Sequence, residues 1–409
     1  MIRISHLGMQ GSFLLIVILL FSFVTYSGAT DIFADPVVFY YTGTPVIYAF
    51  YCLFVNFILN IIKNTKYSIT DNSVFLFIRC ITCLIPLLYT SETSTFFSHY
   101  LVVWVTLFAY VMGMCCDICK LDLYSKLFAG FVVLLCIQVI WTFKSIDVGY
   151  FDLSYKNYMN IPIAPSNVIA TYLSPLLWIV VFNLNVRKLI KIMLSLLIIF
   201  SLILTKSRGG FVGLFITYII YYMIKTRKQK MKIIIMLIVL CVILILLFQI
   251  PEVILFFEGF TAESSSRSAD SLTSGRLSLF SEGLNAFMHN PILGNGITQN
   301  ATHNVVGAHN LIIQLLLESG VLGLILYVVP ILRVLRCSLR NIRQKYVLGF
   351  FLFSVGTLCH GQFEVNFFDY STDIFFWFCI GLLNKINTTH ENTSSKLRLP
   401  QGKYWQDSV

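Results

Sequence analysis

The sequence predicts an all-α, polytopic membrane protein. Of its 409 residues, 57% are hydrophobic and 12% are charged, whereas a soluble domain carries about 25% charged residues. Many apolar runs are long enough to cross the ~30 Å hydrocarbon layer of a membrane as helices. The runs are continuous rather than alternating, so they do not suit the strands of a membrane barrel. The composition therefore excludes a soluble enzyme, a disordered scaffold and a secreted disulfide-rich protein.

Twelve apolar segments are candidate membrane helices. We expect them at residues 12–28, 43–62, 74–90, 97–116, 124–143, 165–183, 189–205, 210–224, 231–250, 309–330, 347–362 and 370–386. The chain then divides into nine spans in residues 1–250, a large loop at 251–308, three spans in residues 309–386 and a tail at 387–409. We expect the polar tail to be disordered.

The basic residues predict the orientation of these spans. With the N-terminus in the cytoplasm, the large majority of the 29 Lys and Arg residues fall in cytoplasmic segments, as the positive-inside rule requires. Both termini are then cytoplasmic, and the loop at 251–308 faces outward. This distribution also explains the net charge of +10, so we expect no nucleic-acid partner.

The eleven cysteines do not indicate a metal site or a disulfide framework. The pairs Cys80/Cys83 and Cys116/Cys119 have the spacing of metal ligands, but no second pair and no histidine cluster accompanies either one. The long outer loop contains no cysteine. We therefore predict no metal site.

A short outer connection between two predicted spans carries two basic residues, Lys206 and Arg208. Ser207-Arg208-Gly209-Gly210 combines a cation with two glycines at a helix start. Glycines let backbone amides approach a ligand closely, and a helix N-terminus favours anions. Arg208, with Lys206, Gly209 and Gly210, is therefore a candidate anion site. The alternative, which we weigh equally, is a pair of basic side chains that reach the membrane interface.

The large outer loop contains an amphipathic helix. Its apolar residues recur on one face at Leu277, Phe280, Leu284, Phe287 and Met288. Ser274 is the expected N-cap, Pro291 prevents continuation of the helix, and Gly294-Asn295-Gly296 forms a tight turn. We expect the apolar face to lie on the membrane surface or on other spans. Arg276 in the first turn opposes the helix dipole, which favours an anionic partner.

Two further positions are candidates for chemistry or for binding. His309, in Ala308-His309-Asn310 at the start of a span, titrates near neutral pH and is the best candidate general base or acid. The alternative is an ordinary hydrogen-bonded interfacial histidine. For Glu318, nine residues later, we expect a structural role or a pairing with another span. Arg79 lies within a span, where an arginine is costly and is by default functional or paired. Its candidate partners are Glu92 and the acidic outer loops.

These motifs occur in a defined order along the chain. The order is Ser207–Gly210, Ser274–Arg276, Asn290–Gly296, Ala308–Asn310 and Leu317–Gly323. It resembles the O-antigen ligase/polymerase superfamily of bacterial membrane glycosyltransferases, which includes the Wzy-like repeat-unit polymerases, over about residues 200–330. By this resemblance we carry over Arg208, Arg276 and His309 as functional residues. We also expect Asn310, which follows His309, to bind substrate. Arg79 matches no motif of the family.

The resemblance implies a glycosyltransferase that acts at the periplasmic face of the bacterial inner membrane. The donor would be a glycan on undecaprenyl pyrophosphate. A polymerase passes the growing O-antigen or capsule chain to the next repeat unit, and a ligase passes the chain to lipid A-core of lipopolysaccharide. The family is expected to work without metal or cofactor and with inversion. A chain-length regulator protein is a candidate partner, and the loop at 251–308 is then periplasmic.

The chemistry of the candidate residues suits this reaction. Cleavage of a sugar–pyrophosphate bond builds negative charge on the leaving group, and the outer loops contain no Asp-x-Asp pair for a divalent cation. We expect Arg208 and Arg276 to stabilise this charge through bidentate contacts, with Lys206 as a weaker third cation. His309 would take the proton of the acceptor hydroxyl, or would orient a substrate if the base is a carboxylate. The alternative bases are Glu364, Asp369 and Asp373.

Several functions compete with polymerisation. The compact turn at Asn290–Gly296 favours a polymerase over a ligase. A transporter of lipid-linked oligosaccharides also suits twelve spans with intramembrane charge, but the sequence has no half-chain repeat, and one long outer loop with arginines favours chemistry on one face. A scaffold role would leave Arg208 and Arg276 unexplained.

Overall fold

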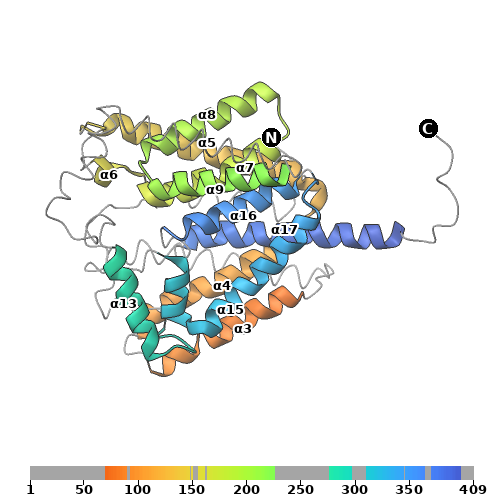
Figure 1. Ribbon diagram of the computed structural model, residues 1–409. Helices are drawn as coiled ribbons and strands as arrows, with labels where there is room; N and C mark the ends of the chain where they lie inside the picture. The colour runs from red at the N-terminus through yellow and green to blue at the C-terminus, as the bar shows by residue number, and fades with distance from the viewer. Residues whose placement is uncertain are drawn as a thin grey trace.

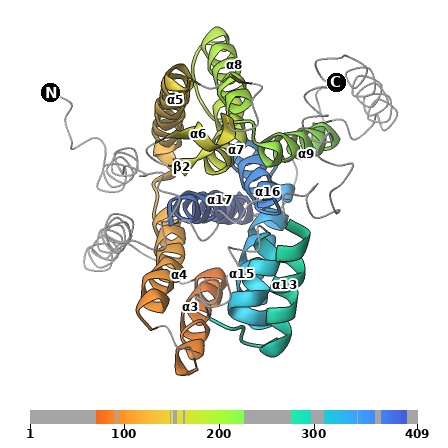
Figure 2. The same ribbon diagram turned by 90° about the vertical axis from the view of Figure 1, so that its left-hand side faces the viewer.

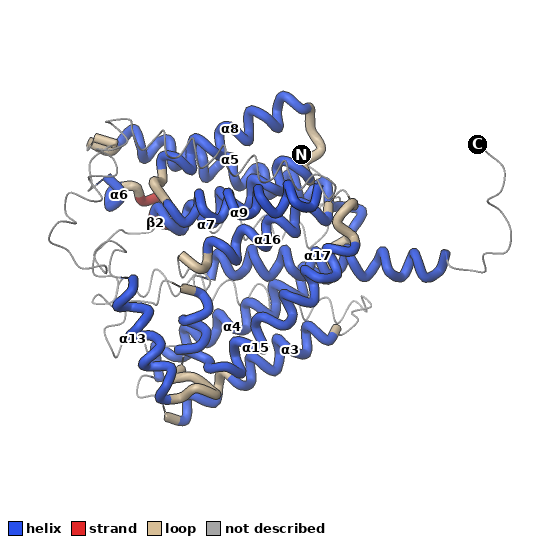
Figure 3. The backbone as a smooth tube through the Cα atoms, in the orientation of Figure 1, coloured by secondary structure: helices blue, strands red, loops and turns tan. Residues whose placement is uncertain are grey.

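The structure, a computed structural model, is helical over almost all of the part of the chain that it describes. It describes residues 70–89, 93–147, 149–150, 155–161, 164–225, 276–296, 310–344, 346–363 and 370–397. Within these segments the strands are β1 (Asn160–Ile161) and β2 (Ala164–Pro165), a two-residue antiparallel pair (Figure 3). The all-α prediction is therefore confirmed. The predicted spans at 12–28, 43–62 and 231–250 lie outside the described residues.

The helices fall close to the other predicted spans. Their bounds are α3 (Asp71–Thr82), η2 (Ile85–Leu88), α4 (Thr93–Met114), η3 (Ile118–Lys120), α5 (Leu121–Ser145), α6 (Tyr155–Tyr158), α7 (Ser166–Phe182), α8 (Lys188–Leu204), α9 (Arg208–Lys225), α13 (Arg276–His289), α15 (Leu311–Arg340), α16 (Val347–His360) and α17 (Tyr370–Leu397). Three described stretches are long and apolar enough to cross a membrane, namely Asp71–Leu88, Ile118–Ser145 and Leu311–Arg340. They support a membrane protein, and the count of twelve spans stays a prediction.

Helices α16 and α17 lie between two groups of helices (Figures 1 and 2). One group contains α5, α7, α8 and α9, and the other contains α3, α4, α13 and α15. α16 packs against α7 and α9, whereas α17 packs along α4. Glycines allow the second contact, because a Cβ at Gly113 would lie 2.2 Å from Phe378 O and one at Gly381 would lie 2.1 Å from Tyr110 O. Close backbone approach at small residues is a typical way for membrane helices to associate.

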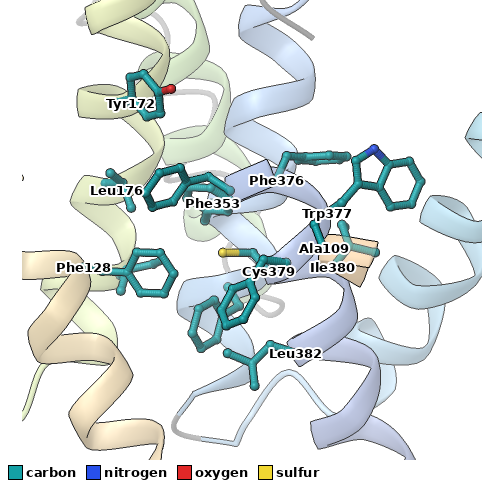
Figure 4. Packing of buried hydrophobic residues seen from close by; sticks show 14 of the residues in the cluster. Ala109, Phe128, Tyr172, Leu176, Phe353, Phe376, Trp377, Cys379, Ile380 and Leu382 are labelled. Carbon is teal, nitrogen blue, oxygen red and sulfur yellow. The ribbon is translucent and has the colours of Figure 1, made fainter. Parts of the chain in front are cut away.

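Aromatic side chains fill the space between the two groups (Figure 4). The ring of Phe131 on α5 stacks on that of Phe375 on α17, with centroids 4.9 Å apart. Phe128 lies against Phe350 and Phe378 at centroid distances of 6.3 Å and 6.2 Å. These rings join α5, α16 and α17 through the offset and edge-on contacts that aromatic pairs prefer.

Two helices differ from their predicted spans. α15 continues to Arg340, past the predicted end at residue 330, and it is broken at Gly320, where φ is 62° and ψ is −169°. α17 continues to Leu397. The prediction of a disordered tail from residue 387 is therefore wrong for residues 387–397. A hydropathy pattern locates the apolar part of a helix, and polar turns that extend the same helix leave no trace in it.

Helix α13 confirms the helix predicted in the large loop, and Arg276 is the first of its described residues. It packs against α15. Gly283 is buried, whereas Leu284 and Met288 are 44% and 71% exposed. The described helices therefore leave much of the surface of these two apolar side chains uncovered. The expected N-cap, Ser274, lies outside the described residues.

Candidate functional site

The connection between α8 and α9 is a tight reversal of the chain. Lys206 adopts a φ of 50°, a left-handed conformation, and its N–H donates to Ile203 O at 3.1 Å. The hydroxyl of Ser207 then accepts a hydrogen bond from the N–H of Gly210 at 3.4 Å, as an N-cap side chain does. The exposed Arg208 is therefore the first residue of α9, which confirms that the motif lies at a helix start.

The ammonium group of Lys206 lies over two tyrosine rings. Its Nζ is 4.7 Å from the ring centroid of Tyr150 and 5.0 Å from that of Tyr155, at cation–π distance. The tyrosine hydroxyls donate to the last carbonyls of α8, at Ile203 O (2.9 Å) and Leu204 O (3.0 Å). Burial raises the pKa of both phenols, so they remain neutral donors. These contacts explain the position of the Lys206 side chain. Its role as a substrate ligand stays a prediction.

The start of α9 packs closely on neighbouring helices. A Cβ on Gly209 would lie 3.0 Å from Phe363 Cβ and 3.3 Å from His360 Nε2, at the end of α16. A Cβ on Gly210 would lie 2.9 Å from Ala170 Cβ on α7. Close packing within the fold therefore explains why both positions are glycine. Their predicted role, a close approach to a ligand, stays a prediction.

The start of α15 is tied to the same end of α16. Asn310 is the N-cap, and its Oδ1 accepts hydrogen bonds from the N–H groups of Ile312 and Ile313 at 3.0 and 3.1 Å. Its Nδ2 donates to Gln362 O at 3.2 Å, and Leu311 N donates to Gly361 O at 2.8 Å. His309, which precedes Asn310 in the chain, lies outside the described residues.

The end of α16 therefore brings together the helix starts that contain Arg208 and Asn310. The sequence motifs do not include this segment or its buried histidine, His360. A signal was present, because an imidazole at the end of an apolar run, followed by Gly361-Gln362, is a costly polar group that must find partners.

The motif at Asn290–Gly296 forms the tight turn that the sequence predicts. Gly294 and Gly296 have φ values of 75° and 96°, a region that glycine populates without strain. The N–H of Gly294 donates to Asn290 O at 2.8 Å, and Asn290 Nδ2 donates to Asn295 Oδ1 at 2.7 Å. The turn follows α13 directly, so it fixes the end of the helix that contains Arg276. The side chain of Arg276 lies outside the described residues.

This turn docks into the break in α15. The break at Gly320 leaves main-chain groups on both sides of it without their intrahelical partners, and the turn supplies four hydrogen bonds to them. These run from Asn295 N to Leu317 O (2.8 Å), from Gly296 N to Glu318 O (3.0 Å), from Val321 N to Pro291 O (2.9 Å) and from Leu322 N to Ile292 O (3.2 Å). The motifs at Asn290–Gly296 and Leu317–Gly323 are therefore one structural unit, which their order in the sequence did not reveal.

Arg79 is buried among α3, α4 and α15. Its Nη1 donates to Thr106 Oγ1 at 3.4 Å, and its Cζ lies 4.8 Å from the ring centroid of Tyr327. Glu318 on α15 is also buried, and it accepts a hydrogen bond from the side chain of Gln314 on the same helix. The expected pairing of Glu318 with another span stays a prediction. A contact between Arg79 and substrate stays a prediction.

Several other predicted partners lie outside the described residues. These are Glu92, Glu364 and Asp369. Asp373, the third alternative base, is buried at the start of α17. Within the described segments, no three or more His, Cys, Asp and Glu side chains are grouped so that they could hold a metal ion.

Comparison with known proteins identifies one segment of the chain. Residues 193–328 match the family described as O-antigen ligase. No curated protein matches the chain. The matched segment includes α9, α13, the docked turn and the break in α15, and with them every motif from Ser207 to Gly323. The match confirms the similarity of this segment to the O-antigen ligase/polymerase superfamily.

Proposed function

We propose that this protein is a membrane glycosyltransferase that lengthens a lipid-linked surface glycan. It would transfer a growing chain from undecaprenyl pyrophosphate to the next lipid-linked repeat unit. One observation carries the proposal. Within the segment that matches the O-antigen ligase family, the helix starts at Arg208 and Asn310 are both held against the end of α16.

The reaction needs a cation at the leaving group and a base at the acceptor. The acceptor hydroxyl attacks the anomeric carbon, the bond from that carbon to the pyrophosphate oxygen breaks, and the pyrophosphate leaves with the electron pair. Arg208 and Arg276 would bind the pyrophosphate through charge-assisted hydrogen bonds, and the start of α9 adds the positive end of its helix dipole. His309 would take the proton.

This mechanism has two further consequences. A single displacement inverts the anomeric centre. The fixed arginines supply the positive charge that the pyrophosphate needs, so we propose that transfer does not depend on a divalent cation. Asn310 would orient His309 through the N-cap that precedes α15, and Gly209 and Gly210 would let α9 lie close to the site. Direct contacts of Lys206 and Arg79 with substrate are part of the same proposal.

We propose that the protein lies in the bacterial inner membrane with both termini in the cytoplasm. The apolar helices and the family match support an inner-membrane protein. The loop at 251–308 would then be periplasmic, between spans in residues 1–250 and 309–386. A membrane-impermeant thiol reagent applied to whole cells should label a single cysteine introduced at Ser265 and leave one introduced at Ser394 unlabelled. The reverse pattern would contradict the orientation.

Ligation is the second candidate function. The matching family is described as O-antigen ligase, and this description favours transfer of the finished glycan to lipid A-core. The compact turn at Asn290–Gly296 favours the polymerase. The comparisons give no support to a transporter.

The test is a reaction with purified protein and synthetic lipid-linked repeat units that match the glycan of the host. A ladder of product lengths, formed also in the presence of EDTA, supports a metal-independent polymerase. Transfer that appears only when lipid A-core is added supports the ligase. No new glycosidic bond in either reaction contradicts the proposal. Addition of the host's chain-length regulator should narrow the ladder if that protein is a partner.

The same reaction tests the roles of individual residues. Arg276→Ala and His309→Ala should abolish transfer while the protein still inserts into the membrane. Near-normal product length in both variants would refute the assignment of these two residues.

A further inference from the structure

We propose that His360 is a positioning residue of the transfer site. The ring of His360 fixes the position of the start of α9, and thereby of Arg208. The turn that follows His360 fixes the position of the start of α15, next to His309. The part of this inference that concerns catalysis depends on the proposed function. The part that concerns the two helix starts does not.

The ring of His360 is held from α7. His360 is 0% exposed, and its Nδ1 lies 2.8 Å from Thr171 Oγ1. The hydroxyl of Thr171 donates to Asn167 O at 3.3 Å, so we assign the proton to Nδ1 of His360, which donates to the hydroxyl. The lone pair is then on Nε2.

The opposite edge of the ring faces α9. Nε2 is 3.3 Å from the place that a Cβ on Gly209 would occupy, and the His360 Cβ lies 3.6 Å from the corresponding place at Gly213. The side chain of His360 thus lies against the first two turns of α9. Amides in the first turn of a helix have no intrahelical acceptors, so an imidazole with its lone pair on this side suits the position.

The turn after His360 reaches the second helix start. Phe363 N donates to His360 O at 2.8 Å, which closes a turn over residues 360–363. Within this turn, the carbonyl of Gly361 accepts from Leu311 N and that of Gln362 accepts from Asn310 Nδ2. A displacement of His360 would therefore move both helix starts. Because the ring is fully buried, it acts through these starts and not on the substrate.

The first variant is His360→Phe, which keeps an aromatic ring and removes both nitrogens. Small displacements of catalytic groups, of about 1 Å, lower rates by up to about 100-fold. We expect kcat to fall about 10- to 100-fold and the acceptor KM to change less than about 2-fold, because Arg208 acts on charge that develops in the transition state. His360→Asn restores a donor near the position of Nδ1 and should recover part of the kcat.

A second pair of variants tests the same contact from α7. Thr171→Val removes the hydroxyl that accepts from Nδ1 and nearly keeps the side-chain shape, whereas Thr171→Ser keeps the hydroxyl. The valine variant should lower kcat in the same direction as His360→Phe, and the serine variant should stay near wild type. These substitutions are smaller than the loss of the imidazole, so they keep the test valid if His360→Phe does not fold.

Amide hydrogen exchange tests the inference without reference to activity. His360→Phe and Thr171→Val should speed exchange in the peptides that cover residues 207–213 and 310–314, and leave peptides of α5 unchanged. If wild-type protein forms no glycosidic bond, the proposed function fails, and this exchange pattern still decides the inference.

Three results would overturn the inference that His360 is a positioning residue. The first is unchanged exchange at both helix starts in folded His360→Phe or Thr171→Val. The second is wild-type kcat in these folded variants of an active enzyme. The third is loss of the neutral-pH limb of the kcat profile in His360→Phe, which would mean that His360 itself transfers the proton.

Discussion

Substitution of Gly320 by alanine should release the turn at Asn290–Gly296 from α15. Gly320 has a φ of 62° and a ψ of −169°, a region that is essentially restricted to glycine and costs other residues about 1–3 kcal/mol. An added Cβ would also lie 2.3 Å from Ile292 O and 2.7 Å from Gly294 N. These neighbours are main-chain atoms, so the turn and the helix must separate.

The separation is costly because it breaks hydrogen bonds on both sides of the helix break. Four main-chain hydrogen bonds join the turn to α15, and each contributes about 0.5–1.5 kcal/mol to stability. Together with the backbone strain, we expect Gly320→Ala to destabilise the protein by at least ~3 kcal/mol. α13 ends at this turn, so Arg276 should lose its fixed position and transfer should fall with stability.

The assay is unfolding of the purified protein in mixed micelles with increasing denaturing detergent, together with hydrogen exchange of residues 290–296. Gly130→Ala is the matched control, since an added Cβ there meets no atom within 4 Å. In the middle of α5, this change should be neutral or should stabilise by up to ~1 kcal/mol. If Gly320→Ala is as stable and as protected from exchange as Gly130→Ala, the docking account is refuted.

Three further predictions concern other parts of the fold. Gly210→Ala should destabilise the protein by about 1–3 kcal/mol, because the new Cβ would lie 2.9 Å from a Cβ of α7. Gly213→Ala should be tolerated, because the nearest atom to its new Cβ is 3.4 Å away. Equal thermal unfolding midpoints for the two variants would contradict this difference. Arg79→Met removes a buried cation that lies 4.8 Å from the ring centroid of Tyr327, so it should lower the stability of the protein. In a double-mutant cycle with Tyr327→Leu we expect a coupling of about 0.5–2 kcal/mol, and zero coupling would contradict the cation–π contact. Burial raises the pKa of the Tyr155 phenol above its ordinary value of 10.0. The neutral hydroxyl therefore contributes fully to the stability of the folded protein below pH 10, and this contribution is lost as the pH rises through the raised pKa. Unfolding measured from pH 8 to 11 should therefore show a shallower alkaline decline in Tyr155→Phe, and an unchanged decline would refute this assignment.

Local sequence patterns were enough to place most of the described helices. The run predicted at 189–205 lies almost wholly within α8, and the run at 124–143 lies within α5. The start of α9 at Arg208 and the end of α13 before Pro291 follow from capping and breaking residues. These signals depend on neighbours in the chain, so a single sequence contains them.

The break at Gly320 is different in kind. The residues on both sides of it are apolar and helical in pattern, and the predicted span at 309–330 therefore passed through the break. The helix can open there because a turn some 25 residues earlier supplies the missing hydrogen bonds. That compensation is a tertiary contact, which the hydropathy of the span does not contain.

The candidate site also contains some features that local sequence predicts and others that depend on tertiary contacts. Sequence order placed Arg208 and Asn310 in one family pattern, and the structure holds their helix starts together through the end of α16. His360 was missed because its importance comes from contacts with Thr171 and Gly209, on two helices distant in sequence. The sequence pattern predicts a ligand next to Gly209 and Gly210, whereas the structure gives both glycines close contacts with α7 and the end of α16.

The central claim is that the exposed arginine at the start of α9 acts on the leaving pyrophosphate. The most direct measurement compares the glycosyl-transfer kcat of Arg208→Ala with that of Arg187→Ala. Arg187 is also an exposed arginine at a helix start, the N-cap of α8. We expect Arg208→Ala to lower kcat by about 100-fold or more and Arg187→Ala to leave it near wild type, with both proteins folded. Equal kcat values in the two variants would contradict the account.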